Sequence, residues 1–158
     1  QIRYIQKKNS YKFLKKKDII IEISGGSPIQ STGRIAYLTD ASLVRFDTPV
    51  ICSNFCRPIT IKDKSLFYYF VYTWKNLYDS KVFFNYEGQT SGIKNLLIDD
   101  FMHNFNLIIP DKEILTKFNI LIDNLESKKQ KLIIEINKLN SFREWLVPLL
   151  MSNKIKIN

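Results

Sequence analysis

The stretch DKEILTKFNILIDNLESKKQKLIIEINKLNSFREWLV, residues 111–147, decides how this chain is organised. It contains no glycine or proline, and its apolar residues recur at alternating steps of four and three positions. Such a repeat, about 3.5 residues long, predicts one long helix with an apolar seam of the coiled-coil type. The seam comprises Phe118, Ile122, Leu125, Leu132, Ile136, Leu139 and Leu146, with Lys129 and Arg143 as its two interruptions.

The two ends of this helix are also marked in the sequence. Asp111 is placed to cap the first turn, and Pro148 is expected to end the helix. Such a helix would be roughly 55 Å long, and it could not shield its own seam from water. We therefore expect another helix to pack on the seam, supplied by a further part of the polypeptide, by a second copy of the chain or by a partner.

Residues 1–110 have a different character, because short β-branched and aromatic runs alternate with turn residues. These runs predict strands, while residues 65–80 have apolar side chains at helical spacing and predict a helix. We expect an α+β chain with a mixed, mostly β domain over residues 1–110, the long helix over 111–147 and a tail over 148–158. The expected strands are residues 18–24, 34–39, 42–46, 49–55 and 81–86.

The chain is basic, and most of the excess charge lies at its start. Its 158 residues include 24 Lys and Arg against 15 Asp and Glu, a formal net charge of +9. Residues 1–17 contain seven basic residues, no acid and several aromatic rings. This composition suits a polyanionic partner, with cations on phosphates and rings on bases; a solvated lysine-rich edge is the alternative. The candidate phosphate contacts are Lys7, Lys8, Lys12 and Lys15.

The composition excludes several classes of protein. No apolar run approaches the roughly 18 to 20 residues of a membrane-spanning helix. The N-terminal segment also lacks the apolar core and cleavage site of a secretory signal. Cys52 and Cys56 are too few for a disulfide scaffold. We therefore expect a cytoplasmic protein with reduced thiols and no membrane partner.

No catalytic residue, metal site or cofactor is expected. The segment around Gly33 superficially resembles a phosphate-binding loop, but Arg34 follows where that loop requires a lysine and then a hydroxyl residue. Cys52, Cys56 and His103 fall short of the four ligands of a zinc site. Cysteine–histidine catalysis would depend on the single histidine, which we expect at the surface or in a loop.

All five glycines lie in two short segments, GGSPIQSTGR (25–34) and NYEGQTSGIKNL (85–96). Amide side chains pair with adenine edges, arginine with guanine, and hydroxyls or lysine with phosphate, so both segments are candidates for contacting DNA. Ordinary hairpin turns have the same composition and remain the alternative. The candidate residues are Ser27, Gln30, Ser31, Thr32 and Arg34 in the first segment, and Gln89, Thr90, Ser91, Lys94 and Asn95 in the second.

The chain resembles the target recognition domain of the DNA specificity subunit of type I restriction–modification systems, followed by one of that subunit's long spacer helices. The resemblance rests on the order and spacing of five segments. These are KKKDIIIEISGGSPIQSTGRIAYLT, SNFCRPITI, EGQTSGIKNL, FNLIIPDKEI and FREWLVPLLMSNKIKI. Recognition domains of that family are longer at the N-terminus, so we expect residues 1–110 to lack an opening strand and helix, as in a fragment or a natural half-subunit.

The resemblance implies a function without catalysis. In that family two recognition domains, separated by two long antiparallel helices, each recognise one half of a bipartite double-stranded DNA target. The subunit assembles with a methyltransferase (modification) subunit and a restriction subunit, which carry the cofactor chemistry. This chain would then recognise one half-site, and its seam would pack against the second helix. The alternative is a basic coiled-coil interaction module without sequence-specific DNA binding.

Overall fold

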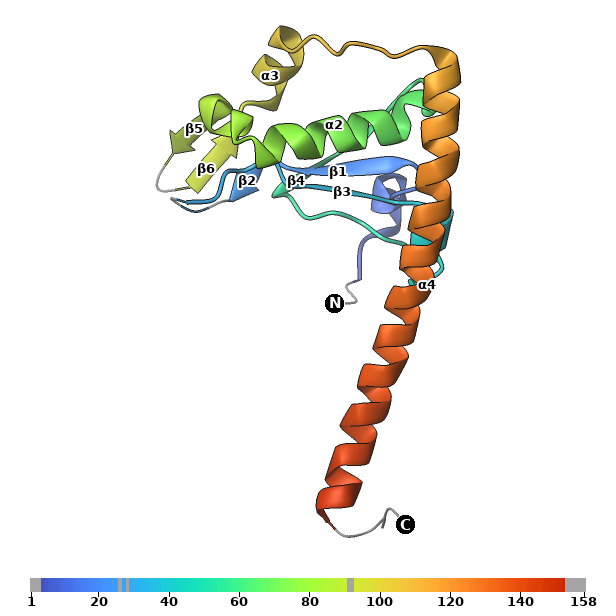
Figure 1. Cartoon of the computed structure of the whole chain (residues 1–158). Helices are drawn as coiled ribbons and strands as arrows, with labels where there is room; N and C mark the ends of the chain where they lie inside the picture. The colour runs from blue at the N-terminus through green and yellow to red at the C-terminus, as the bar shows by residue number, and fades with distance from the viewer. Residues whose placement is uncertain (1–3, 26, 28, 91–92, 153–158) are drawn as a thin grey trace.

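The chain folds into a small α+β domain, and one long helix runs along its side and projects beyond it (Figure 1). The structure is a computed structural model that describes residues 4–25, 27, 29–90 and 93–152, without the side chains of residues 89 and 90. In chain order the elements are η1 (Lys7–Lys12), β1 (Asp18–Glu22), β2 (Ser24–Gly25), β3 (Ile35–Tyr37), α1 (Asp40–Leu43), β4 (Cys56–Thr60), η2 (Lys64–Leu66), α2 (Phe67–Asp79), η3 (Val82–Tyr86), β5 (Glu87–Thr90), β6 (Ile93–Leu96), α3 (Ile98–Asn104) and α4 (Lys112–Met151).

The strands form two antiparallel three-stranded sheets. The first has the order β3-β1-β4, with Ile20 of the central strand opposite Ala36 and Pro58. The second has the order β2-β6-β5, and its strand β2 follows β1 closely in the chain. Between these two strands, the carbonyl of Ile23 accepts a hydrogen bond from the backbone N–H of Leu96 (2.9 Å). The second sheet therefore continues from the first, at the end of the domain farthest from α4 (Figure 1).

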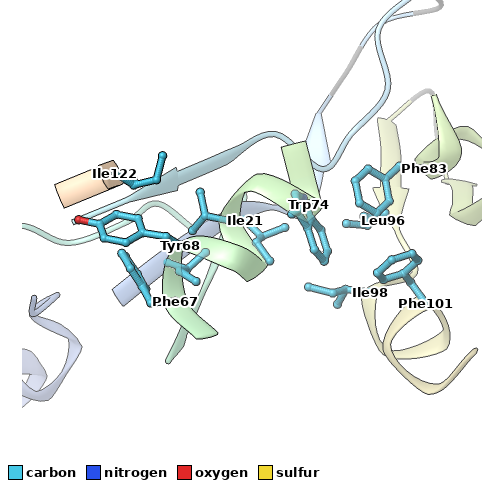
Figure 2. Packing of buried hydrophobic residues seen from close by; sticks show 11 residues of the cluster. Ile21, Phe67, Tyr68, Trp74, Phe83, Leu96, Ile98, Phe101 and Ile122 are labelled. Carbon is cyan, nitrogen blue, oxygen red and sulfur yellow. The ribbon is translucent and has the colours of Figure 1, made fainter. Parts of the chain in front are cut away.

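Aromatic side chains fill the space between α2 and the sheets. The alternation of β1 buries Ile19 and Ile21 completely. The ring of Trp74 in α2 lies 4.5 Å from that of Phe83 and 5.3 Å from that of Phe101, centroid to centroid. Figure 2 shows this cluster running along α2 as one continuous core. Truncating such a buried aromatic residue costs about 3 to 5 kcal/mol, so the core fixes α2 against both sheets.

The first half of α4 is part of this core. Ile122 is 6% exposed and belongs to the buried cluster, and the ring of Phe118 packs edge-on against that of Tyr72. These two seam residues therefore pack into the domain itself, Phe118 against helix α2, and not against a helix from outside the domain. The second half of α4 leaves the domain (Figure 1), and its seam residues are at least half exposed over most of its length. The exposed fractions are 50% for Leu132, 55% for Ile136 and 61% for Leu139, and Leu125, in the first half of α4, is already 52% exposed.

Both predicted helices are confirmed, and so are the predicted strands at 18–24 and 34–39, although the structure divides the first between β1 and β2. Asp111 occupies the N-cap position of α4, but its side chain makes no capping hydrogen bond. The predicted end at Pro148 is wrong, because α4 continues to Met151. Proline removes one backbone hydrogen bond and crowds the preceding turn, but α4 continues for only three residues after Pro148, and this last turn still forms.

Three predicted strands are wrong. Residues 42–46 begin inside α1, whose N-cap residue Thr39 forms a capping box with Ser42, and this local hydrogen bonding outweighs the β-branched composition. Residues 49–55 form no strand, and pairing with β1 begins only at Cys56. Residues 82–86 form the 3-10 helix η3, which buries Phe83 against Trp74. Nowhere in the part of the chain that the structure describes is a helix both long and apolar enough to cross a membrane.

Candidate nucleic-acid interface

The two glycine-bearing segments meet at one end of the domain. The first leaves β2, and the second forms the hairpin of β5 and β6. Pairing of Ser24 with Asn95 and of Gly25 with Lys94 places them side by side. We call this region the loop end, defined as residues 24–34 together with residues 87–96. It lies at the opposite end of the domain from α4 (Figure 1).

A buried ion pair joins the two segments of the loop end. Glu87 Oε1 accepts hydrogen bonds from the backbone N–H of Thr32 (2.6 Å) and from its hydroxyl (3.1 Å). Glu87 Oε2 lies 2.9 Å from Lys94 Nζ, and the two side chains are only 7% and 12% exposed. Lys94 Nζ also lies 4.7 Å above the ring of Phe84. One carboxylate therefore connects the first segment to both strands of the hairpin.

The electrostatics of this site keep Glu87 charged. Burial by itself raises the pKa of the Glu87 carboxyl, but the hydrogen bonds from Lys94 and Thr32 together lower that pKa by more. The net result is a pKa below the usual range for glutamate. The buried carboxylate is thus ionised at neutral pH, and its charge is matched by Lys94.

A second ion pair lies where the first segment returns to the sheet. Arg34 donates from Nε (2.9 Å) and from a terminal nitrogen (2.6 Å) to the two oxygens of Glu22. This forked hydrogen bonding with Glu22 raises the pKa of the Arg34 guanidinium above its usual value. The Arg34 side chain is 57% exposed, so it is held in one orientation while part of it still faces solvent.

Gly33 is required by close packing beneath the first segment. Its φ is +103°, a conformation that side chains disfavour, and an added Cβ would lie 2.9 Å from the ring of Phe83. The carbonyl of Gly33 accepts a hydrogen bond from Trp74 Nε1 (2.7 Å). The backbone of the first segment is therefore fixed directly on the aromatic core.

The structure separates the predicted DNA-contacting residues into two groups. Gln30 and Arg34 are exposed at the loop end, and Ser27 is half-buried with its backbone paired to Gln30. The other placed residues are turned inward or bonded within the loop end. Ser31 and Thr32 are 3% and 0% exposed, Lys94 is paired with Glu87, and Asn95 accepts a hydrogen bond from the Ser24 hydroxyl (2.7 Å). The side chains of Gln89 and Thr90 and all of Ser91 lie outside the described residues.

The basic N-terminal segment lies away from the loop end. Lys7, Lys8, Lys12 and Lys15 are exposed. After η1 the segment contacts the residues around α1. The backbone N–H of Lys17 donates to the carbonyl of Leu38 (2.8 Å), and Lys16 forms an ion pair with Asp40. In Figure 1, η1 lies below the first sheet on the side of α4. The predicted phosphate contacts and the predicted base contacts therefore belong to different regions of the domain.

Two residues that organise the loop end, Glu22 and Glu87, are absent from the predicted set. Acidic side chains repel DNA phosphates, so a search for DNA ligands passes over them. A usable signal is present nevertheless, because Glu87 shares its segment with Lys94, and Glu22 lies shortly before the segment that carries Arg34. Pairing with these acids buries Lys94 but leaves Arg34 partly exposed.

The remaining candidate chemistry is also placed. His103 is exposed, as predicted, and its Nδ1 is hydrogen-bonded to the carbonyl of Asp99 (2.6 Å) within α3. Cys52 and Cys56 are free thiols, and burial raises the pKa of Cys52, away from the reactive thiolate. Over the described ranges, no three His, Cys, Asp or Glu side chains are grouped so that they could hold a metal ion.

Comparison with known protein families gives one match. A family model described as the type I restriction modification DNA specificity domain matches residues 1–138, which spans both the loop end and most of α4. The chain belongs to this family. Searches of curated proteins and of solved structures gave no match. As a type I restriction modification DNA specificity domain, the chain is a non-catalytic recognition module with a function in DNA specificity, which confirms the resemblance.

Proposed function

We propose that this specificity domain recognises one half of a bipartite double-stranded DNA target through its loop end. The observation that carries the proposal is the buried link from Glu87 to Thr32 and Lys94, which combines two glycine-bearing segments into one surface. Exposed side chains on that surface, Gln30 and Arg34, have the chemistry that reads base edges and phosphates. Two segments linked to each other above a packed core are a suitable scaffold for sequence recognition.

The proposal extends to the other parts of the chain. Lys7, Lys8, Lys12 and Lys15 would contact phosphates and supply affinity that does not depend on sequence. The exposed seam of α4 would pack against a second long helix, from another specificity half or another copy. Modification and restriction subunits in the cytoplasm would carry the methyl-transfer and cleavage chemistry.

Selection from a randomised duplex library tests the main proposal. The full chain should enrich a short sequence motif, and its affinity for the selected duplex should fall steeply as salt rises. Gln30→Ala should change the selected motif or its strength. Asn106→Ala, an exposed amide in the connection before α4, is the matched control and should leave the motif unchanged.

The outcomes separate the two functions that the sequence left open. Salt-sensitive binding without any enriched motif would show a generic cationic surface and refute sequence recognition. Replacing the four N-terminal lysines by glutamine should weaken binding to all duplexes alike and leave the motif unchanged. A motif that changes with these lysines would contradict their assignment to phosphate.

A further inference from the structure

The turn at Ser53–Phe55 lies directly beside the loop end. The sequence predicts that these residues end a strand, but in the structure they form a tight turn. The carbonyl of Ser53 accepts the backbone N–H of Cys56 (3.0 Å), which closes the turn just before β4. Asn54 is exposed at its tip, and Phe55 keeps 57% of its side-chain surface exposed.

Backbone hydrogen bonds fix this turn to the root of the first segment. The carbonyl of Phe55 accepts the N–H of Ile23 (2.8 Å) and the N–H of Ser24 (3.2 Å). Ser24 is the first residue of β2, and its hydroxyl donates to Asn95 of the hairpin. The turn, the first segment and the hairpin therefore meet at Ser24. The turn is thus a third segment at the loop end, beside the two glycine-bearing segments, and it contains no glycine.

Two arginines lie near the turn, and each is oriented by an ion pair with an acid. Arg57, two residues after Phe55, is exposed and paired with Asp99 at the surface (2.8 Å). On the other side, Arg34 is bonded to Glu22, whose partner in the sheet is Cys56. An exposed aromatic ring and an exposed amide thus share this part of the surface with two partly exposed arginines. That combination of apolar contact, base-edge hydrogen bonding and phosphate neutralisation is the usual chemistry of a nucleic-acid surface.

We propose that the Ser53–Phe55 turn is a third DNA-contacting segment, in which Phe55 makes apolar contact with a thymine methyl group and Asn54 bonds to a base edge. This inference rests on the proposed function, because it places the turn on the same duplex that the loop end recognises. Arg34 and Arg57 would contact phosphates near the turn. The turn then contributes to which sequence is selected, in addition to the two glycine-bearing segments.

The test uses the full chain and the duplex that it selects from a random library. Phe55→Ala should lower the affinity for that duplex about tenfold, which is the scale of a single base contact in duplex recognition. Phe55→Tyr keeps the ring and should keep the affinity. Asn54→Ala should relax the preference at one position of the motif. The matched control is Phe46→Ala, because Phe46 is also an exposed phenylalanine (44%) but follows α1, which contacts α4.

Each outcome decides the inference. If the wild-type chain selects a motif and both Phe55→Ala and Asn54→Ala retain its affinity and sequence, the inference is overturned while the proposed function stands. If the wild-type chain selects no motif, both are overturned together. An equal loss for Phe46→Ala and Phe55→Ala would also overturn the inference, because the effect would not be specific to the turn. Urea unfolding of each variant verifies that the loss of affinity does not come from loss of folding.

Discussion

Replacing Glu87 by glutamine removes the charge that links the two segments of the loop end while almost preserving the shape of the side chain. Glutamine can still accept the hydrogen bonds from Thr32, but Lys94 is left as a cation only 12% exposed and without its counter-charge. Breaking a buried ion pair by removing one partner costs about 3 to 5 kcal/mol. Because Lys94 keeps its contact with the ring of Phe84, we expect a smaller loss of about 2 kcal/mol for Glu87→Gln. For Glu87→Ala, which also leaves Thr32 unpaired, we expect about 3 to 4 kcal/mol.

Urea unfolding monitored by tryptophan fluorescence measures this loss, because Trp74 is bonded to the carbonyl of Gly33 beside the site. A surface pair provides the control. Glu113 and Lys117 are 79% and 75% exposed, so Glu113→Gln should unfold at the wild-type urea concentration within error. The double variant Glu87→Gln with Lys94→Met removes both charges and should regain part of the lost stability.

Two results would refute this reasoning. A Glu87→Gln variant as stable as the Glu113 control would show that the buried pair contributes nothing. A double variant whose loss equals the sum of the two single losses would show that Glu87 and Lys94 act independently. In either case the loop end would be held together by its backbone pairing alone.

Three further predictions concern the core and the helix. Burial raises the pKa of the Glu126 carboxyl, but the hydrogen bonds from Lys129 and Tyr37 lower it by more. The ionised carboxylate therefore stabilises the folded state above about pH 4.3, and this contribution is lost as the pH falls through the folded-state pKa. The stability of Glu126→Gln should therefore fall less than that of the wild type between about pH 5 and pH 3 in unfolding titrations, and parallel curves would contradict this. Gly33→Ala should cost about 2 to 3 kcal/mol, measured by urea unfolding, because of its positive φ and the ring behind it; a neutral effect would contradict the packing. Leu132→Asp combined with Leu139→Asp should reduce the mass of any assembly formed through α4 in sedimentation velocity, while Asn137→Asp, which lies off the seam, should not; an unchanged mass in the double variant would refute the seam.

The helices could be predicted from the sequence because their signal is local. The 3.5-residue repeat of α4 and the apolar spacing of α2 are properties of consecutive residues. The strands at 42–46 and 81–86 were mispredicted because composition competes there with hydrogen bonding and burial. The Thr39 capping box favours helix α1 at the start of the first of these stretches, and the packing of Phe83 on Trp74 accompanies the 3-10 helix η3 in the second. The capping box is a local signal that the composition of residues 42–46 hides, whereas the packing of Phe83 depends on which residues meet in space.

The location of the candidate site was predictable, but the role of its residues was not. The glycines identified both segments, because glycine is favoured where a chain reverses or packs closely, as Gly33 does against Phe83. That the two segments meet depends on the pairing of β2 with β6, residues 24 and 95, which are far apart in the sequence. The same pairing turns Thr32 and Lys94 inward to Glu87. A polar residue in a loop can contact a ligand or build the loop, and only the fold distinguishes these roles.

The polar contacts between α4 and the domain have a consequence for the geometry of the whole recognition module. A helix with a regular apolar repeat can shift by one turn along its partner and still bury similar residues. Here Tyr37 donates to Glu126 (2.6 Å) and Tyr68 donates to Asp123 (2.5 Å), and both hydrogen bonds are directional. A shift of one turn would break both and leave Glu126, only 4% exposed, as a buried charge without its tyrosine partner. These tyrosines therefore define one register of α4 on the domain, and with it the distance from the loop end to the exposed seam. In the proposed assembly, where the seam joins two halves, that distance fixes how far apart the two halves of the DNA target must lie.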